Sequence, residues 1–311
     1  MKISVVIPCY GSENTIEAVV DEIENTIHQR KIEHEIILVN DCSPDQVWKR
    51  ITSLSQKYDS VKGISFAKNF GQHSALMAGY RKSTGDIVIS MDDDGQTPAD
   101  ELYKLVDQIE AGYDVVYATY EDKKHNSFRN MGSKLNDFMC NILLGKPKGL
   151  MVTSYFAARR FIIDEICRYR NSYTYVIGLI FRSTKNIGTV SVTHRSRTEG
   201  SSGYTFKKLI NLWLNGFTAF SVKPLRFATM MGILIASSGF LYVIYILLNK
   251  MMNPEVPLGW SSTMAAILLI GGLILFTLGI IGEYLGRVYI SINDAPQYVI
   301  NKKTEDRITR D

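Results

Sequence analysis

Short apolar runs alternate with longer amphipathic stretches along the first 120 residues of the chain. The runs have the length and the β-branched content of buried strands. They occupy residues 3–8, 35–39, 61–66, 87–91 and 115–118. Between them, apolar residues recur every three or four positions, which predicts helices around residues 14–27, 47–54, 72–80 and 98–110. Strands that alternate with helices of this length predict an α/β fold, with a mostly parallel sheet covered on both faces.

The last third of the chain has a different pattern, with two apolar runs at residues 227–248 and 261–282. Each run holds 22 residues without a formal charge. As a helix, such a run spans roughly 33 Å and matches the hydrocarbon core of a bilayer. Lysine and arginine are concentrated outside the pair, whereas the connecting loop has only Lys250 and Glu255. By the positive-inside rule, this predicts a multi-pass protein of the inner or plasma membrane with both termini in the cytoplasm.

The segment before the first apolar run is amphipathic. From residue 204 to 222, apolar and aromatic side chains recur at helical spacing on the face opposite Lys207 and Lys208, which predicts a helix at the membrane surface. We therefore expect four parts. They are a cytoplasmic α/β domain at 1–203, a juxtamembrane helix at 204–223, two transmembrane helices at 224–282 and a cytoplasmic tail at 283–311. The end of the tail, after Asn301, is expected to be frayed.

The composition argues against several functional classes. The net charge of +4 is too small to indicate a nucleic-acid partner. Four cysteines lie far apart without a Cys-x-x-Cys pair, which disfavours a zinc site and a disulfide framework and fits a reducing compartment. Two transmembrane helices bury little surface by themselves, and this favours self-association into a homo-oligomer.

Polar clusters stand at the carboxyl ends of three predicted strands, at residues 8–13, 40–45 and 92–96. Because these ends of parallel strands meet at one edge of a sheet, the clusters are expected to converge on one ligand. The chain has no Gly-x-Gly-x-x-Gly and no Gly-x-x-x-x-Gly-Lys-Ser/Thr motif, so neither a dinucleotide loop nor a P-loop supplies phosphate contacts.

The third cluster begins with three consecutive acids, Asp92, Asp93 and Asp94. Adjacent carboxylates repel one another at a half-buried strand end, so a cation is expected beside them. Hard oxygen ligands at positions i and i+2 project the same way from an extended chain and suit Mg²⁺ or Mn²⁺ shared with substrate phosphates. A solvated acidic turn is the alternative. Thr97 and Pro98 then predict the N-cap and the first residue of the next helix.

The three clusters resemble the signatures of glycosyltransferase family 2 enzymes with the GT-A fold. They are Val5-Val6-Ile7-Pro8-Cys9-Tyr10, Leu38-Val39-Asn40-Asp41-Cys42-Ser43-Pro44-Asp45 and Met91-Asp92-Asp93-Asp94-Gly95-Gln96. With the C-terminal hairpin, the chain is similar to the polyprenyl-phosphate glycosyltransferases within that family. The resemblance implies metal-dependent, inverting transfer of a hexose from a nucleotide sugar, UDP-linked rather than GDP-linked, to undecaprenyl or another polyprenyl phosphate.

The resemblance also implies roles for single residues. Asp92 and Asp94 would be catalytic, and the metal ligands would be Asp94, Gln96 and Asp92. The residues that would bind the nucleotide sugar are Pro8, Tyr10, Glu13, Asp41, Lys68, Asp92, Asp93 and Arg197. Asp93 stands where the family usually has a small residue. For Lys68, a solvated surface lysine is the alternative.

A basic element follows the predicted strands in the sequence. Arg129 and Ser133 resemble the family's Arg-x-x-x-Ser element, which grips the lipid phosphate, and the resemblance implies that both are catalytic. Lys123 and Lys124 lie just upstream and would join this lipid-phosphate site. An arginine fork and a serine hydroxyl suit a phosphate monoester. The apolar stripe at residues 135–143 predicts either a helix on the bilayer surface or an ordinary core face.

The chain departs from the family pattern in two places. Relatives often carry an Asp two or three residues from a Phe, as the catalytic base or near it, where this chain has Val152-Thr153-Ser154-Tyr155-Phe156. We expect Tyr155 to supply the hydroxyl nearest the position that relatives fill with Asp. A phosphate monoester is largely a dianion at neutral pH, so a lipid-phosphate acceptor needs no base. In the glycine- and serine-rich loop that starts at Arg197, Gly203 replaces the family's lysine. Lys207 and Lys208 are the candidates to substitute for it.

Two other functions stay open at this point. A processive polysaccharide synthase would need more membrane spans and a Gln-x-x-Arg-Trp motif, but none of the three tryptophans follows an arginine. A non-catalytic membrane scaffold that binds a nucleotide sugar would not need Asp92, Asp94 and Gln96 together. Turnover of any sugar donor would eliminate the scaffold.

Overall fold

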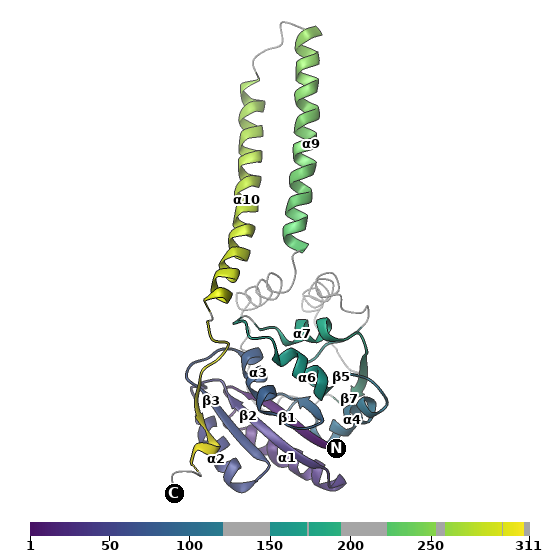
Figure 1. Ribbon diagram of the computed structural model, residues 1–311, viewed down its shortest axis with the longest axis vertical. Helices are drawn as coiled ribbons and strands as arrows, with labels where there is room; N and C mark the ends of the chain where they lie inside the picture. Colours follow the sequence, from purple (N-terminus) through teal and green to yellow (C-terminus); the bar gives the residue numbers. More distant parts are fainter. Residues whose placement is uncertain (121–149, 173, 194–222, 253–258, 294, 308–311) are drawn as a thin grey trace. The chain divides into compact units, whose positions relative to one another are not determined.

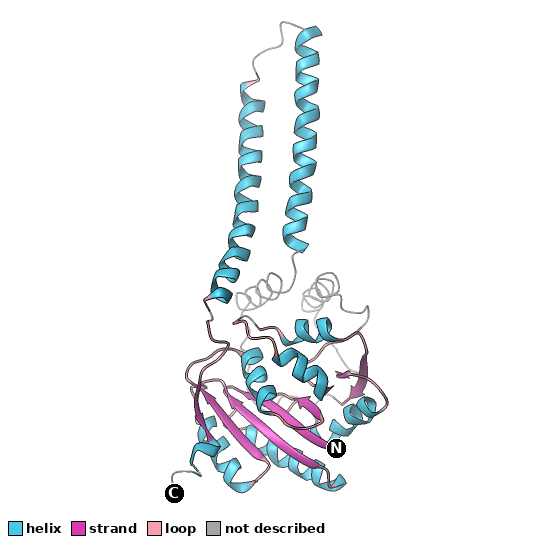
Figure 2. Cartoon of the chain, in the orientation of Figure 1, coloured by secondary structure: helices cyan, strands magenta, loops and turns pink. Residues whose placement is uncertain are grey.

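The computed structural model describes residues 1–120, 150–172, 174–193, 223–252, 259–293 and 295–307. The chain divides into two compact units, residues 1–209 with 294–311, and residues 210–293. The first unit is an α/β domain and the second contains two long helices (Figures 1 and 2). The juxtamembrane helix predicted at residues 204–222 and the stripe at residues 135–143 lie outside the described residues.

The α/β unit is built around one eight-stranded sheet. Its strands are β1 (Lys2–Cys9), β2 (Glu33–Asn40), β3 (Val61–Phe66), β4 (Ile87–Ser90), β5 (Val115–Tyr120), β6 (Phe156–Arg159), β7 (Ile187–Val192) and β8 (Ile300–Lys303). Its helices are α1 (Ile16–Arg30), α2 (Val47–Lys57), α3 (Gln72–Lys82), α4 (Leu102–Glu110), α6 (Arg160–Cys167) and α7 (Val176–Ser183). Two short 3-10 turns are η1 (Ala99–Glu101) and η2 (Thr304–Arg307).

The strand order is β7-β5-β6-β4-β1-β2-β3-β8. β1 pairs in parallel with both β2 and β4, and β2 pairs in parallel with β3. The chain therefore leaves β1 toward one side of the sheet and returns to β4 on the other, which makes a topological switch point at the carboxyl ends of β1 and β4. β6 runs antiparallel between β4 and β5, and β8 runs antiparallel beside β3. The prediction of an α/β fold with a mostly parallel sheet is confirmed.

Alternate residues of β1 face two different helical layers. Ile3, Val5 and Ile7 are fully buried in a core cluster that also contains residues of α1, α2 and α4. Val6 points the other way, toward α3, where Gly79 leaves room for it. A Cβ atom on Gly79 would lie 2.2 Å from Cγ1 of Val6. Helix α3 therefore packs directly on the sheet, and its first turn lies near the carboxyl ends of the strands.

The helix predicted from residue 98 begins differently. Pro98 is the N-cap of the 3-10 turn η1, and the α-helix α4 starts only at Leu102. The backbone of Pro98 is extended, with ψ of 102°, so the chain makes one tight turn before regular α-helical hydrogen bonds form. The prediction that Thr97 is the N-cap is therefore wrong.

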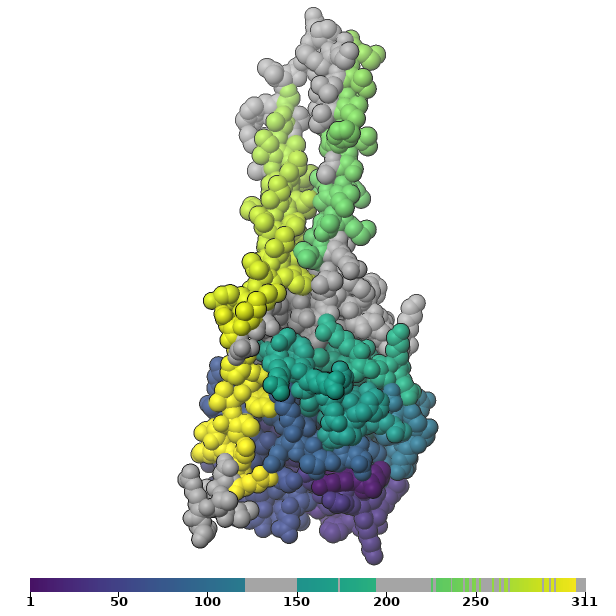
Figure 3. All heavy atoms as spheres, in the orientation of Figure 1, coloured from purple at the N-terminus to yellow at the C-terminus, as the bar shows by residue number. Residues whose placement is uncertain are grey.

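Residues 302–307 continue β8 and form the turn η2 against the α/β unit, so the prediction that the chain is frayed directly after Asn301 is wrong for these residues. We call residues 295–307 the C-terminal strap (Figure 3). Its strand β8 pairs with β3, and the hydroxyl of Thr304 accepts the backbone N–H of Gly63 at 3.0 Å. Lys82 forms an ion pair with Glu305 at 2.9 Å. A polar strand can occupy a sheet edge because its side chains remain in water there.

The second unit consists of α9 (Lys223–Met252) and α10 (Trp260–Ile292), which contact each other. Large apolar side chains along both helices are exposed, which suits a lipid environment better than water. Among the described residues, one stretch is long and apolar enough to cross a membrane, Leu269–Ile290, with a mean hydropathy of 1.8. Helix α9 contains a shorter apolar stretch, Ala228–Tyr242. The stretch in α10 thus lies later in the chain than the predicted run at 261–282.

Candidate active site

Side chains tie together the loops that follow β1, β2 and β4. The backbone N–H of Tyr10 donates to the carboxylate of Asp93 at 2.9 Å, and the N–H of Gly11 donates to the hydroxyl of Ser43 at 2.8 Å. Glu13 adds a second link between the β1 and β2 loops, because its carboxylate accepts the N–H of the residue before α2 at 2.6 Å. The three polar clusters therefore meet at one edge of the sheet, as their positions after parallel strands predict.

Asp92 is held at both of its carboxylate oxygens. Gln72, the first residue of α3, donates to Oδ1 at 3.2 Å, and the hydroxyl of Ser154 donates to Oδ2. The second contact follows from the antiparallel pairing of β4 with β6. Ser90 lies opposite Phe156, and two residues further on in this register Asp92 lies opposite Ser154. The two hydrogen bonds restrict the carboxylate to one orientation.

The acidic turn is electrostatically unfavourable without a cation. Burial raises the pKa of Asp92 to about 6, helped by the charges of Asp94 and Asp93, although its two hydrogen bonds lower it. Burial also raises the pKa of Asp93, against the hydrogen bond from the Tyr10 N–H. Within the described ranges, neither Asp92 nor Asp93 forms an ion pair with a basic side chain. A bound cation would therefore relieve a repulsion that these parts of the protein leave uncompensated.

The residues fit a hard divalent cation that is shared with a ligand. Asp92 and Asp94 carry carboxylates two residues apart, and Oδ1 of Asp94 accepts the N–H of Gln96 at 3.0 Å. In the part of the chain that the structure describes, no group of three or more His, Cys, Asp and Glu side chains is placed to hold a metal. Mg²⁺ sites commonly use one or two carboxylates and complete their coordination with substrate phosphates and water. The donor set suits such an open site.

Asp41 contacts the protein backbone with both of its carboxylate oxygens. Its side chain is 4% exposed and accepts the N–H groups of Phe70 at 2.7 Å and Gly71 at 2.8 Å. Burial raises the pKa of Asp41, and these two N–H groups act in the opposite direction. The φ angle of Gly71 is +89°, which favours glycine at this turn into α3. Asp41 thereby holds residues 67–71, which we call the Asp41 loop.

The other predicted nucleotide-sugar residues lie around the same edge. Tyr10 is 56% exposed, so its ring is accessible to a base. Pro8 is buried in β1 opposite Val39. The Nζ atom of Lys68 lies 4.9 Å from the ring centroid of Phe70, within the Asp41 loop. The ligand contacts of these residues stay predictions.

Five predicted site residues lie outside the described residues. They are Lys123, Lys124, Arg129, Ser133 and Arg197. Their roles in binding the lipid phosphate and the nucleotide sugar therefore also stay predictions.

Comparison with protein families identifies the chain. Residues 4–167 match the family described as Glycosyl transferase family 2. The chain belongs to this family. Residues 223–288 match a second family model, the GtrB C-terminal hairpin, so this part of the glycosyltransferase is a hairpin of this type.

Relatives are similar over nearly the whole chain. An undecaprenyl-phosphate 4-deoxy-4-formamido-L-arabinose transferase of Serratia proteamaculans is 34% identical, over 97% of this chain and 93% of the relative. An uncharacterized glycosyltransferase of Bacillus subtilis, YkcC, is 32% identical, over 96% of this chain and 93% of the relative. The fold resembles that of glucosyl-3-phosphoglycerate synthase from Mycobacterium tuberculosis, solved with Mn²⁺, UDP and glucosyl-3-phosphoglycerate. That structure has a TM-score of 0.52 and 21% identity, over 69% of this chain and 75% of the other.

Sequence reasoning missed the two residues that hold Asp92 in this glycosyltransferase. In the sequence, Ser154 stands out only as part of a segment without the usual Asp, and Gln72 only as the start of a predicted helix. The expectation that Tyr155 supplies the nearest hydroxyl is wrong, because Tyr155 is fully buried and its hydroxyl donates to the carbonyl of Pro98 at 3.1 Å. The short apolar run after Ser154 was the available signal, since a strand there would pair with β4.

Removing each of two adjacent hydroxyls should separate activity from stability. Ser154→Ala removes a hydrogen bond to a charged group, so we expect kcat/KM for sugar transfer to fall about 10- to 100-fold. Tyr155→Phe removes a core hydrogen bond, so it should lower stability by about 1 kcal/mol with little change in kcat/KM. Steady-state kinetics and thermal unfolding in one detergent test both variants. Equal losses of activity would contradict the placement of these hydroxyls.

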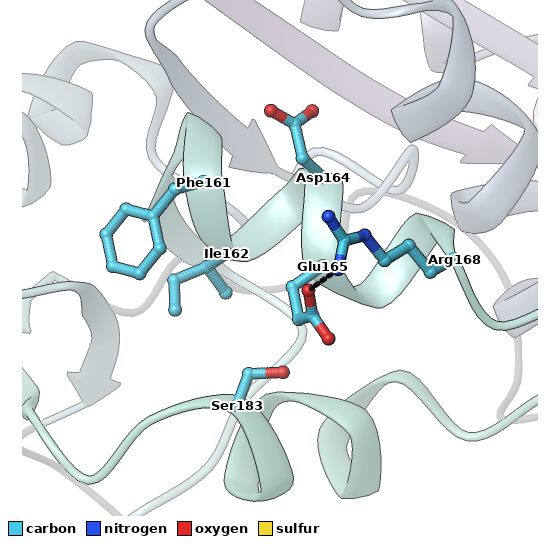
Figure 4. A pocket seen from close by; sticks show the side chains of 6 residues that line it. All are labelled: Phe161, Ile162, Asp164, Glu165, Arg168 and Ser183. Carbon is cyan, nitrogen blue, oxygen red and sulfur yellow. Dashed lines mark ion pairs between the residues drawn. The ribbon is translucent and has the colours of Figure 1, made fainter.

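A hollow of about 360 Å³ lies away from this edge, between α6 and α7 (Figure 4). Its lining residues are Phe161, Ile162, Asp164, Glu165, Arg168 and Ser183. Glu165 and Arg168 form an ion pair at 3.0 Å, so their charges largely compensate each other. The hollow contains none of the predicted site residues. The hollow is therefore separate from the candidate site at the edge of the sheet.

Proposed function

We propose that this glycosyltransferase transfers a hexose from a UDP-linked donor, such as UDP-glucose, UDP-galactose or UDP-N-acetylglucosamine, to undecaprenyl or another polyprenyl phosphate. The product is a lipid-linked sugar donor for the assembly or modification of cell-envelope glycans. Family membership supports the sugar transfer. The hairpin and the name of the Serratia relative support the acceptor.

The main support for the proposed function is the acidic turn at the switch point. Asp92, Asp93 and Asp94 follow β4 at the place where open α/β sheets bind their ligands. Tyr10 follows β1, which pairs with β4, and Asp41 follows β2, the next strand of the same sheet. The same chain continues into an apolar helix that can cross a membrane, where a polyprenyl acceptor would be found. This combination favours a membrane transferase over a soluble one.

Different side chains of the protein have different roles in the proposed reaction. Asp94 and Asp92 would hold the divalent cation, which supplies charge neutralisation for the departing diphosphate. Gln72 and Ser154 fix the orientation of Asp92. An oxygen of the lipid phosphate attacks the anomeric carbon from the face opposite the diphosphate. The bond between the anomeric carbon and the diphosphate oxygen breaks as the new carbon–oxygen bond forms, and the nucleoside diphosphate leaves. The configuration is therefore inverted.

No side chain needs to act as a general base in this reaction. The lipid phosphate is largely a dianion at neutral pH, so it loses no proton when it attacks. Free alcohols should accordingly be very poor acceptors. The hydroxyl of Ser154, which stands near the place where relatives have an acid, is instead used to hold Asp92.

The acceptor phosphate is assigned to Arg129 and Ser133, with Lys123 and Lys124 nearby, on the sequence resemblance. Arg129→Ala should raise the KM for polyprenyl phosphate at least 10-fold, on the order of one charge-assisted hydrogen bond, and leave the KM for the sugar nucleotide nearly unchanged. Measuring both KM values in one detergent-lipid mixture tests this. Equal increases would place Arg129 at the diphosphate.

The proposal includes a membrane topology. The α/β unit and both termini face the cytoplasm, helix α9 and helix α10 span the bilayer, and residues 204–223 lie along its inner surface. The excess of lysine and arginine outside the apolar pair supports this orientation. Self-association of the hairpin is part of the proposal, because two spans bury little surface.

A second donor class is favoured by the relatives. The Serratia protein is named for a 4-deoxy-4-formamido-L-arabinose substrate, and its similarity extends over nearly all of this chain. A UDP-linked 4-amino-pentose derivative is therefore the alternative to a hexose donor.

One experiment tests the proposed function. Purified protein is incubated with Mn²⁺, undecaprenyl phosphate and a panel of UDP- and GDP-sugars that includes the formamido-arabinose donor, and the lipid product is weighed by mass spectrometry. A mass increase of one hexose with a UDP donor is expected. A pentose-derived product would select the alternative donor, a lengthening polymer would indicate a processive synthase, and no product with any donor would contradict transferase activity.

A further inference from the structure

We propose that Tyr298 of the C-terminal strap is a positioning residue for the Asp41 loop, and through this loop for the donor nucleotide. The assignment of the loop to the nucleotide rests on the proposed function. The positioning itself rests on contacts within the α/β unit.

An unbroken chain of contacts joins Tyr298 to Asp41. The ring of Tyr298 stacks on the ring of Phe66, with centroids 5.2 Å apart and planes 7° apart. Phe66 meets Phe70 edge to face at 5.7 Å. The backbone N–H of Phe70 donates to the carboxylate of Asp41 at 2.7 Å. Phe66 is 1% exposed, so a change on one side of its ring is transmitted to the other side by packing rather than absorbed by solvent.

Backbone contacts also join the C-terminal strap to the Asp41 loop. The carbonyl of Val299 accepts the N–H of Ala67, the first residue of the Asp41 loop, at 2.9 Å. The pairing of β3 with β8 shifts register between Ser65 and Phe66, directly before the loop begins. Such irregularities bend a strand and redirect the residues that follow it. The strap therefore influences the direction in which the chain leaves β3.

Tyr298 is itself held in place. Arg81 of α3 donates to the side-chain oxygen of Gln297 at 2.7 Å, and its guanidinium carbon lies 5.4 Å from the centroid of the Tyr298 ring. Gln297 is 6% exposed and donates to the carbonyl of Asn171 at 3.1 Å. On the other side of Tyr298, β8 continues the pairing with β3. A ring anchored from both sides can hold Phe66 in one position.

Loops at binding sites open locally at small free-energy cost. A contact of moderate strength therefore changes the fraction of molecules in which the loop is open. An aromatic pair contributes enough beyond its buried area to change such an equilibrium by about 2- to 10-fold. Losing the whole ring also removes the apolar cover of Phe66, so Tyr298→Ala should act at the upper end of this range. Tyr298→Phe keeps the ring and should behave like the wild type.

Hydrogen exchange of the full-length protein in detergent tests the positioning without substrate. In Tyr298→Ala, the amides of Phe70 and Gly71 should exchange about 10-fold faster, whereas those of β1 should not change. Tyr298→Leu is a milder second variant with the same expected direction. Val299→Ala is the matched control, because it shortens the neighbouring, 42% exposed side chain and keeps the backbone carbonyl that Ala67 uses.

The kinetic counterpart is a rise in the KM for the UDP-sugar in Tyr298→Ala, with the KM for the lipid acceptor unchanged and full recovery in Tyr298→Phe. Unchanged exchange of the Asp41 loop in both Tyr298→Ala and Tyr298→Leu would overturn the positioning. Equal acceleration in the loop and in β1 would also overturn it, because the ring would then support only the stability of the whole unit. Faster exchange confined to the loop with an unchanged KM for the UDP-sugar would support the positioning and contradict the assignment of the loop to the nucleotide.

Discussion

Asp94→Asn is expected to lower kcat for sugar transfer by about 10³-fold, the size of effect seen when a main stabiliser of transition-state charge is removed. The substitution keeps an oxygen that can accept the N–H of Gln96, so the turn should retain its shape. It removes the negative charge that a divalent cation requires. The thermal unfolding temperature should therefore stay within about 2 °C of the wild type, because asparagine has nearly the same volume and keeps this hydrogen bond.

Direct titration with Mn²⁺ in the presence of UDP gives a readout that does not depend on turnover. Binding should be lost in Asp94→Asn and retained in Asp107→Asn, a matched control on the exposed face of α4, where Asp107 pairs with Arg30 at 3.1 Å. Full transfer activity of the wild type in excess EDTA would contradict the metal requirement. Wild-type kinetics in Asp94→Asn would contradict the role of this carboxylate.

Strands β1 to β5 could be predicted from the sequence because each has its own local apolar pattern, whereas β7, which pairs in parallel with β5, was not predicted. Runs such as 3–8 and 87–91 are apolar except for one serine each, and they end in polar clusters, which is typical of strands buried on both faces. The meeting of Tyr10, Asp41 and Asp92 at one edge then follows from the geometry of parallel strands alone. No knowledge of the helices is needed for this step.

The antiparallel strands could not be predicted in the same way. β6 and β8 have only four residues each, and their partners lie far away in the sequence. β8 is mostly exposed, so it lacks the apolar pattern of a strand, and only its pairing with β3 orders it. The contact of Ser154 with Asp92 depends on the register of β6 against β4, which no local pattern specifies.

The sequence also could not predict the direction in which individual side chains point. The family resemblance implies that Asp41 binds the nucleotide sugar, which stays a prediction, but it gives no sign that both carboxylate oxygens accept N–H groups of the Asp41 loop. Tyr155 and Ser154 are neighbours with hydroxyl groups, and consecutive residues near a strand point to opposite faces. Which of the two faces the site depends on the pairing of β6, so the sequence alone could not distinguish them.

Glu35→Gln is expected to be the most destabilising of these substitutions. Glu35 is 2% exposed in β2 and lies at the opposite end of the strands from the site. Its carboxylate accepts the hydroxyl of Ser4 at 2.7 Å and the N–H of Thr84 at 2.6 Å, and it pairs with Lys62 at 2.7 Å. Burial alone would raise the pKa of Glu35, but these partners outweigh it and lower the pKa from 4.5 to about 2.

A carboxylate whose pKa is lowered by folding stabilises the folded state where it is ionised in both states. The contribution of Glu35 is therefore complete above about pH 4.5 and is lost as the pH falls toward about 2. Its full size is about 3 kcal/mol. For a unit of this size, that corresponds to a fall of about 6–12 °C in the unfolding temperature of Glu35→Gln at pH 7. The difference from the wild type should narrow as the pH is lowered from about 5 to about 3.

Glu33→Gln is the matched control, because it makes the same change two residues earlier in β2, where the side chain of Glu33 is 72% exposed and pairs with Lys2 at 3.2 Å. Such an exposed pair contributes at most about 1 kcal/mol, so the unfolding temperature of this variant should stay close to the wild type at every pH. Unfolding is followed by differential scanning fluorimetry of the full-length protein in one detergent across the pH series. A difference between Glu35→Gln and the wild type that does not change with pH would show that the loss arises from packing rather than from the ionised carboxylate.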